Sequence, residues 1–501
     1  MTALAHLHSV PARPLLPRGL EMPGTVRQRS VVHVLALGLV WLAVASGSVV
    51  FTEPAPTDAL MIGVIALLPV IGLVSFRPAQ IALAAVWLVI IAGGFVAAID
   101  ASAPDEATKH MAISLYLAAA SVVLAGFVSM KPAAHTRLLL DAHLFGAMIA
   151  AFAGLAGYFD FVPGAAELFV KFDRASGPFK DPNVFGPYLI PALVYALHLW
   201  LVRPLHRGIP PMLAFAVLAM AILLSFSRAA WAGSALAVAI YLYVAFVTTR
   251  SQLDRLRIVV LVGAGLMLMA PLLLVAVQND AVGKLLSERA TLTQTYDVGP
   301  EGRFGGQEKA FDLIGEHPLG LGALEFPRRY HHEDVHNVYL SMFLNSGWIG
   351  GCLFLALAVS LLVLGFAHAL KATETQRLHL VAYAALTANT FAGLFVDTDH
   401  WRHLYLLIAI TVGLMASRRR KARRTSRIVA DRRPMLLRRI VVLPPTRRRA
   451  RIVRRTAEVV HLYPDPLLHR PAGGFRRAAR LIGPTQPKRL ARIRGTALAR
   501  S

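Results

Sequence analysis

One long, nearly uninterrupted apolar run decides the class of fold: Val31-Val-His-Val-Leu-Ala-Leu-Gly-Leu-Val-Trp-Leu-Ala-Val-Ala-Ser-Gly-Ser-Val-Val50. A bilayer core of roughly 30 Å is crossed by a helix of about 20 apolar residues. The run is preceded by 30 residues that include Arg13, Arg18, Arg27 and Arg29. A segment of this length is long for a cleaved signal peptide. The pattern therefore predicts a cytoplasmic leader at residues 1–30, followed by a retained signal-anchor helix.

The same criterion predicts further membrane spans along the chain. They lie near 58–75, 79–98, 110–129, 138–158, 184–201, 211–226, 229–248, 258–278, within 337–368, and near 379–395 and 403–417. The chain is 56% hydrophobic and only 16% charged, which excludes a soluble globular protein. We expect an all-α fold, a polytopic membrane bundle of about 12 transmembrane helices within residues 31–417. The seventh and eighth spans are close enough to form a tight hairpin.

The charges of the loops predict the orientation of the bundle. Cytoplasmic loops retain more Lys and Arg, and the even-numbered loops have roughly three times the basic density of the odd-numbered ones. An even number of spans then places both termini in the cytoplasm. Two outer segments are too long to be simple turns, 159–183 and a large periplasmic loop at 279–336. Loops of this length usually carry function.

The excess positive charge lies in the last part of the chain. Residues 418–501 contain 26 of the 52 Lys and Arg, whereas the whole chain has a net charge of +24. We expect a disordered cytoplasmic tail that binds anionic lipid headgroups. No nucleic-acid-binding motif accompanies this charge, so no nucleic-acid partner is expected. The single cysteine, Cys352, excludes an intramolecular disulfide and a cysteine-rich metal site.

A candidate anion site lies in Gly177-Pro-Phe-Lys-Asp-Pro-Asn-Val-Phe-Gly-Pro-Tyr-Leu189, where the first long outer loop enters a span. Asp181 is suited to cap a helix, and Pro182 to occupy the first helical position. The free amides of such a helix end, together with the charge of Lys180, favour an anion. The alternative is an ordinary turn and helix cap that binds nothing.

Two arginines lie at the outer ends of predicted spans. They are Arg228, in Ser225-Phe-Ser-Arg228, and Arg402, in Asp397-Thr-Asp-His-Trp-Arg402. Charge at membrane depth is costly and tends to mark a functional site. The alternative is an interfacial arginine whose head reaches water. For Arg402, Asp397 and Asp399 are also available to neutralise the charge.

The large loop contributes Gly302-Arg303-Phe304, a predicted helical stretch around Gln307–Gly315, and His336-Asn337-Val-Tyr339. Neutral imidazole is a base near pH 7, so His336 is a candidate proton acceptor, the alternative being a solvated loop histidine.

The segment His332-Glu333-Asp334-Val335-His336 also matches the H-E-x-x-H pattern of zinc proteases. That site requires a stable helix, and this segment is polar all round. Third-ligand candidates are distant in sequence: Asp397, Asp399, His400 and His403.

Taken in order, these motifs resemble the O-antigen ligase and polymerase family over residues 175–415. They are Gly177-x-Phe-x-Asp-Pro-Asn-x-Phe-Gly-x-Tyr-Leu189, Ser227-Arg-Ala-Ala-Trp231, Arg303, His317-Pro-Leu-Gly-x-Gly322, His336-Asn-x-Tyr-Leu340 and Gly347-x-Ile-Gly350. The resemblance implies a bacterial inner-membrane enzyme whose large loop caps a lateral cavity open to lipid. The first five spans match only as membrane helices, and the basic tail lies outside the family pattern.

The resemblance also implies a reaction. Members transfer a glycan from an undecaprenyl diphosphate carrier to a periplasmic acceptor, without a metal or soluble cofactor, and the acceptor is lipid A core or a growing glycan chain. It implies catalytic roles for His336, Arg228 and Arg303. We expect diphosphate binding to involve Lys180, Arg228, Arg303 and Arg402, supported by Asp181, Asn183, Asn337 and Tyr339. The role of Lys180 is inferred from its local charge and not from the resemblance. A transporter or flippase is the alternative, although such carriers usually place carboxylates deep within their spans.

Overall fold

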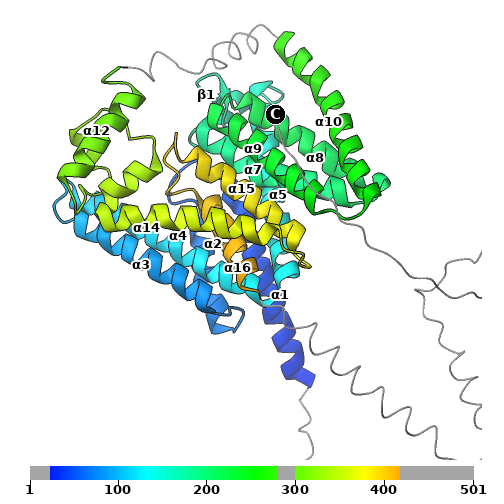
Figure 1. The fold of residues 1–501 in the computed structure, drawn as a ribbon, viewed down its shortest axis with the longest axis horizontal. Coiled ribbons are helices and arrows are strands. Elements are labelled where there is room, and N and C mark those ends of the chain that lie inside the picture. The colour runs from blue at the N-terminus through cyan, green and yellow to red at the C-terminus, as the bar shows by residue number, and fades with distance from the viewer. Residues whose placement is uncertain (1–22, 279–298, 418–501) are drawn as a thin grey trace, which may run out of the picture. The chain divides into compact units, whose positions relative to one another are not determined.

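The computed structural model describes residues 23–278 and 299–417 and is almost entirely helical (Figure 1). The leader up to residue 22, part of the large loop and the basic tail lie outside the described residues, so the expectations for them stay predictions. Helices come in the order α1 (Pro23–Ala45), the short 3₁₀ helix η1 (Ser46–Ser48), α2 (Pro56–Val70), α3 (Pro78–Ala97), α4 (Pro104–Met130), α5 (Pro132–Tyr158), α6 (Ala165–Phe169), α7 (Pro182–Val202), α8 (Leu205–Leu224), α9 (Arg228–Thr248), α10 (Gln252–Gln278), α12 (Arg303–Glu316), α13 (Glu325–Arg329), α14 (Val338–Ala369), α15 (Gln376–Ala392) and α16 (Arg402–Ala416).

Each of the twelve expected spans coincides with a helix. Within the described residues, eight helices are long and apolar enough to cross a membrane, and α2 and α16 are shorter apolar helices. The chain is therefore a polytopic helical membrane protein, and the count of twelve spans stays a prediction. The first helix begins at Pro23, so it extends into the expected leader before the apolar run starts at Val31.

Proline fixes the starts of several helices. It is the first residue of α2, α3, α4, α5 and α7, where its missing N–H costs nothing and its φ angle suits the helix. Beside these helices the described chain has a small antiparallel pair, β1 (Val170–Lys171) with β2 (Arg174–Ala175), and an isolated bridge between Val50 and Phe179. The pair follows α6 and leads directly into the start of α7.

Helix α7 lies at the centre of the bundle. In its most apolar window 89% of the residues are buried, compared with 28% in α14. It packs against α5, α8, α9 and α15, while α4 packs on α3 and α16, and α14 runs along α3. Helices α8 and α9 are separated only by residues 225–227, but α8 packs mainly against α7 and α9 mainly against α15, so the expected tight hairpin is wrong.

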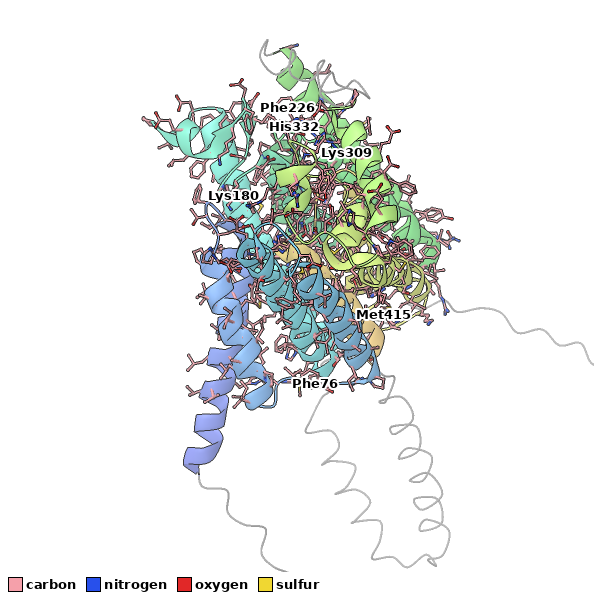
Figure 2. All side chains as sticks on the ribbon, turned by 90° about the vertical axis from the view of Figure 1, so that its left-hand side faces the viewer. Phe76, Lys180, Phe226, Lys309, His332 and Met415 are labelled. Carbon is pink, nitrogen blue, oxygen red and sulfur yellow. The ribbon has the colours of Figure 1, made fainter. Side chains whose placement is uncertain are left out.

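The loops predicted to lie outside gather at one end of the bundle. Figure 2 shows Lys180, Phe226, His332 and Lys309 towards one end, whereas Phe76 and Met415 lie towards the other. Lys180 precedes α7, Phe226 precedes α9, and Lys309 and His332 belong to the large loop. Segments far apart in the sequence therefore meet where the candidate residues are found.

The described part of the large loop is locked onto a kink in α14. Gly347, inside α14, has a φ of 67°, and the chain bends there. Leu321 N–H donates to the Leu344 carbonyl at 2.6 Å, and Trp348 N–H donates to the Pro318 carbonyl at 2.9 Å. A Cβ on Gly320 would lie 2.7 Å from the Leu344 oxygen. The glycines of the His317–Gly322 motif thus permit the backbones to touch, which fixes the loop that carries His336.

Candidate active site

His336 lies in an irregular segment between α13 and α14 rather than on a helix. Its φ is 53°, which breaks any helical run through this segment. Asn337 follows as the N-cap of α14, its Oδ1 accepting from the N–H groups of Tyr339 at 3.1 Å and Leu340 at 3.3 Å. The Tyr339 hydroxyl donates to the Thr390 carbonyl of α15 at 2.7 Å. Asn337 and Tyr339 therefore hold the end of the helix next to His336.

The H-E-x-x-H pattern does not form the protease site. Residues 332–336 are not helical, so His332 and His336 do not lie one turn apart on a helix. His332 instead approaches Glu301, with Nδ1 at 3.4 Å from Oε2, and 57% of its side chain is exposed. The protease interpretation is thus wrong, because the helix that would align both imidazoles is absent from this segment.

A carboxylate from the loop before α16 holds His336. The His336 N–H donates to Asp397 Oδ2 at 3.0 Å, and the imidazole Nδ1 lies 3.8 Å from the same oxygen. The Ser341 hydroxyl donates to Asp397 Oδ1 at 2.6 Å. Burial and the neighbouring Asp399 carboxylate raise the pKa of Asp397 to about 7. The sequence placed Asp397 only as a possible counter-ion of Arg402 or a distant metal ligand, and missed this contact.

Arg303 approaches His336 from α12. It is the first residue of that helix, and Gln307, one turn later on the same face, points its amide Nε2 at the His336 carbonyl, 3.4 Å away. Burial and the charge of Arg303 lower the pKa of His336, outweighing the opposite effect of Glu333 and Asp334. The imidazole is consequently neutral near pH 7 and able to accept a proton. The structure thus brings two of the three candidate catalytic residues together.

Arg228 is the first residue of α9, where Ser227 caps the helix by accepting from the Ala230 N–H at 3.4 Å. The preceding turn is held by Arg174, which the sequence interpretation did not single out. Arg174 Nε donates to the Ser225 carbonyl at 2.8 Å, and its Nη2 donates to Asn183 Oδ1 at 2.8 Å. This buried arginine links the start of α7 to the start of α9, so Asn183 has a positioning contact of its own.

The start of α7 matches the expected cap. Asp181 Oδ1 accepts from the Asn183 N–H at 2.5 Å, and Pro182 is the first residue of the helix. Lys180, just before them, is half exposed, and its Nζ lies 3.3 Å from Glu53 Oε2. The predicted cap is confirmed, while the anion role of Lys180 stays a prediction.

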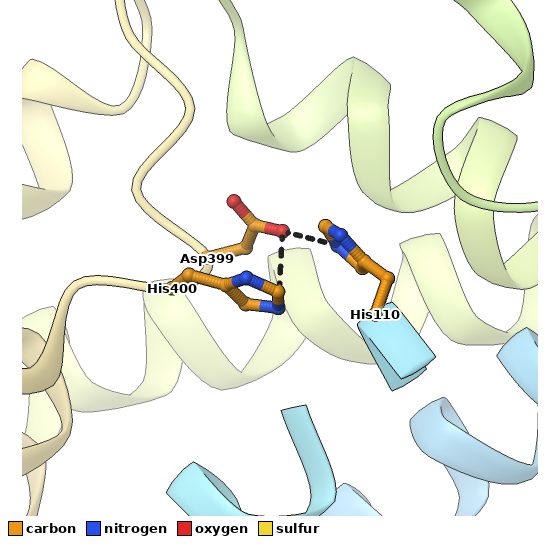
Figure 3. Close-up of side chains that lie close together, drawn as sticks. All are labelled: His110, Asp399 and His400. Atoms are coloured by element: carbon orange, nitrogen blue, oxygen red, sulfur yellow. Dashed lines mark hydrogen bonds and ion pairs between the residues drawn. The ribbon is translucent and has the colours of Figure 1, made fainter. Parts of the chain in front are cut away.

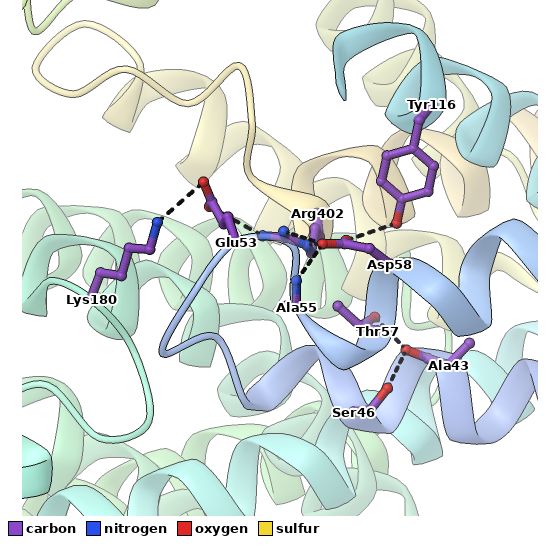
Figure 4. Close-up of polar contacts among 9 residues, drawn as sticks. All are labelled: Ala43, Ser46, Glu53, Ala55, Thr57, Asp58, Tyr116, Lys180 and Arg402. Carbon is purple, nitrogen blue, oxygen red and sulfur yellow. Dashed lines mark hydrogen bonds and ion pairs between the residues drawn. The ribbon is translucent and has the colours of Figure 1, made fainter. Parts of the chain in front are cut away.

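Arg402 has a different partner from the two suggested by its sequence neighbourhood. Its Nε and Nη2 donate to Asp58 Oδ1 and Oδ2, each at 2.7 Å, and its Nη1 lies 3.7 Å from Glu53 (Figure 4). Asp58 also accepts from the Tyr116 hydroxyl at 3.0 Å. The bidentate pair ties α16 to α2, so Asp397 and Asp399 do not neutralise this guanidinium as expected. Asp399 instead pairs with His110 (Figure 3).

A cavity of about 170 Å³ lies beside Arg402 and Asp397. Its lining includes Lys180, Arg402, Asp397 and His400, with Phe179 and Tyr188 on the apolar side. Two cationic side chains and the carboxylate that holds His336 therefore share the wall of one hollow, whereas His336, Arg228 and Arg303 are not among its lining residues. The hollow suits an anionic group and touches the proposed base only through Asp397.

Residues 213–355 match the family model described as O-antigen ligase. The chain carries an O-antigen ligase domain. The matched stretch includes Arg228, Arg303 and His336, whereas Lys180 and Arg402 lie outside it. The resemblance seen in the motifs is thereby confirmed, and the chain is a membrane-bound transferase of O-antigen biosynthesis. No curated protein matches the chain.

Proposed function

We propose that this O-antigen ligase domain transfers a glycan from an undecaprenyl diphosphate carrier to an acceptor hydroxyl at the periplasmic face of the bacterial inner membrane. The acceptor is lipid A core for a ligase, or a growing glycan for a polymerase. The observation that carries the proposal is the position of the His336 imidazole, which Asp397 holds and Arg303 approaches. A base beside a guanidinium is what transfer from a diphosphate requires.

The arginines act on the leaving group. When the anomeric carbon separates from the diphosphate oxygen, negative charge develops on that oxygen, and preorganised cations stabilise it. Arginine is suited to this task because it stays protonated and binds phosphate oxygens in a bidentate manner. We assign Arg228 and Arg303 to the diphosphate. Lys180 lines the cavity together with Asp397, and Arg402, already paired with Asp58, contributes charge and shape to its wall.

The imidazole acts on the acceptor. Asp397 lies on the Nδ1 side of His336 and Glu333 Oε2 lies 3.5 Å from Nε2. We assign Nε2 to accept the proton of the attacking hydroxyl, which then takes the place of Glu333 at this nitrogen. The acceptor oxygen forms a bond to the anomeric carbon as the bond to the diphosphate breaks, and the bonding electrons leave with the diphosphate. A single displacement of this kind inverts the configuration at the anomeric carbon. After the product leaves, His336 releases the proton to water.

A gene deletion distinguishes the two acceptors. A strain without a ligase accumulates long lipid-linked chains, whereas a strain without a polymerase accumulates single repeat units on the carrier. Purified protein incubated with lipid-linked glycan and acceptor should form the transferred product. If the reconstituted protein moved labelled lipid-linked glycan across the bilayer and formed no product, the chain would be a flippase and the proposal would be wrong.

A further inference from the structure

A cluster of two histidines and one aspartate lies next to the proposed catalytic site and is not used by its mechanism. His110 comes from the first turns of α4, while Asp399 and His400 come from the loop before α16 (Figure 3). His110 Nε2 lies 3.0 Å from Asp399 Oδ2, and His400 Nε2 lies 4.0 Å from the same oxygen. These three atoms all lie within 4.8 Å of one another. From these contacts we infer that the cluster binds a divalent transition-metal ion, with Zn²⁺ as the type.

The spacing suits a tetrahedral ion. Bonds of about 2.0–2.1 Å at tetrahedral angles place neighbouring ligand atoms about 3.3 Å apart. The two separations from Asp399 Oδ2, 3.0 and 4.0 Å, lie on either side of that value. Two imidazoles and one carboxylate are a common ligand set for zinc, with a fourth position left for water or another oxygen ligand.

The cluster is largely buried, and a neighbouring hydroxyl holds its loop in place. The side chains of His110, Asp399 and His400 are only 15%, 10% and 20% exposed. The Tyr405 hydroxyl donates to the Asp399 carbonyl at 2.7 Å, which fixes the backbone of the loop. A loop backbone held in this way orients the ligands and raises metal affinity. The Ser114 hydroxyl lies 3.0 Å from His400 Nε2, so it must turn aside when that nitrogen binds the ion.

An ion also has a route to the cluster, because His400 lines the 170 Å³ cavity. A second group of similar composition, Glu301, His331 and His332, provides a contrast. There the Glu301 and His332 side chains are 83% and 57% exposed, so water competes for both ligands. We infer binding only at the buried cluster, which makes His332 a matched control within the same chain.

The test measures bound metal in the full-length protein in detergent. The protein is stripped with a chelator, dialysed against Zn²⁺ or Co²⁺, and its metal content is determined by mass spectrometry. One equivalent per chain is expected, with the visible absorption of tetrahedral Co²⁺. His110→Ala, Asp399→Asn and His400→Ala should each weaken binding by at least about 100-fold. His332→Ala should retain the full equivalent.

Two outcomes would overturn the inference: no metal bound by the unaltered protein, or the same stoichiometry in all four variants. Size-exclusion profiles and melting temperatures identify any variant that fails to fold, and in that case the Co²⁺ spectrum of Asp399→Asn, which keeps the shape of the side chain, is decisive. The family resemblance implies transfer without a metal, so metal content and glycan transfer are separate readouts. A protein that transfers glycan but binds no metal refutes only this inference.

Discussion

Asp397 accepts a hydrogen bond from the backbone N–H of His336 at 3.0 Å, across 61 residues of sequence. The same carboxylate lies 3.8 Å from the imidazole Nδ1. One side chain therefore fixes both the backbone and the ring of the proposed base. The left-handed conformation of His336 is held by this contact and by the adjoining cap of α14.

Removing the imidazole should remove the base. His336→Ala is expected to lower the rate of glycan transfer by about 10²–10⁴-fold, the usual contribution of a general base. His332→Ala, four residues earlier and 57% exposed, should transfer at close to the normal rate. Transfer of labelled glycan from the lipid carrier by the purified variants measures both. Full activity in His336→Ala would end the assignment of the base.

The pH dependence of transfer should respond to the charges around His336. Its lowered pKa means that the neutral form persists below pH 6.5 and that activity falls only as the pH drops further. Arg303→Gln removes a cation, so the pKa of His336 should rise and the acidic limb should move to higher pH. Glu333→Gln removes a carboxylate, so the limb should move to lower pH. Rate profiles that shift in the same direction for both variants would contradict this electrostatic account.

The arginines should matter through the transition state. Arg228→Ala and Arg303→Ala are each expected to lower kcat by about 10²–10³-fold, as loss of a charge-stabilising donor does elsewhere. Arg303→Lys should recover part of this loss, since it restores the charge but not the bidentate geometry. Lys180→Ala, whose side chain is half exposed, should cost much less. Normal kcat in both alanine variants would refute their assignment to the diphosphate.

Arg402 and Asp58 should behave as a structural pair. Asp58→Ala leaves a guanidinium that is only 20% exposed without its bidentate partner, and we expect a loss of about 3–5 kcal/mol in stability. The double variant Asp58→Leu with Arg402→Met removes both charges and should recover much of that loss. Melting temperatures in detergent measure both. A double variant as unstable as Asp58→Ala would show that the pair is not the source of the effect.

The glycines at the α14 kink should be intolerant of a side chain. Gly320 has a φ of +89°, and its Cβ would lie 2.7 Å from the Leu344 oxygen. Gly320→Ala should therefore cost at least about 1 kcal/mol and reduce transfer, because the loop bearing His336 is displaced. Gly315→Ala is the matched control, since nothing lies within 4 Å of its Cβ and the residue is helical. Equal melting temperatures for the two variants would show that the loop is not locked at this point.

The sequence by itself determined the helices and the order of the functional motifs. The local composition of an apolar run indicates that it is a helix in lipid. A proline or an aspartate at a helix start acts within one turn of the helix, as at Asp181 and Pro182. For these reasons all twelve segments, the cap of α7 and the helix around Gln307–Gly315 could be predicted. The motif order from Gly177 to Gly350 likewise indicated the family that the domain match confirmed.

Only the tertiary structure decided which charged groups meet. Arg402 pairs with Asp58 across 344 residues rather than with its near neighbours Asp397 and Asp399. Arg174 reaches Ser225, Asp397 reaches His336, and His110 reaches Asp399. Such contacts depend on how the helices pack and on the angles of the loops that join them. Hydropathy and motif spacing carry no information about either, because each describes a single segment of the chain.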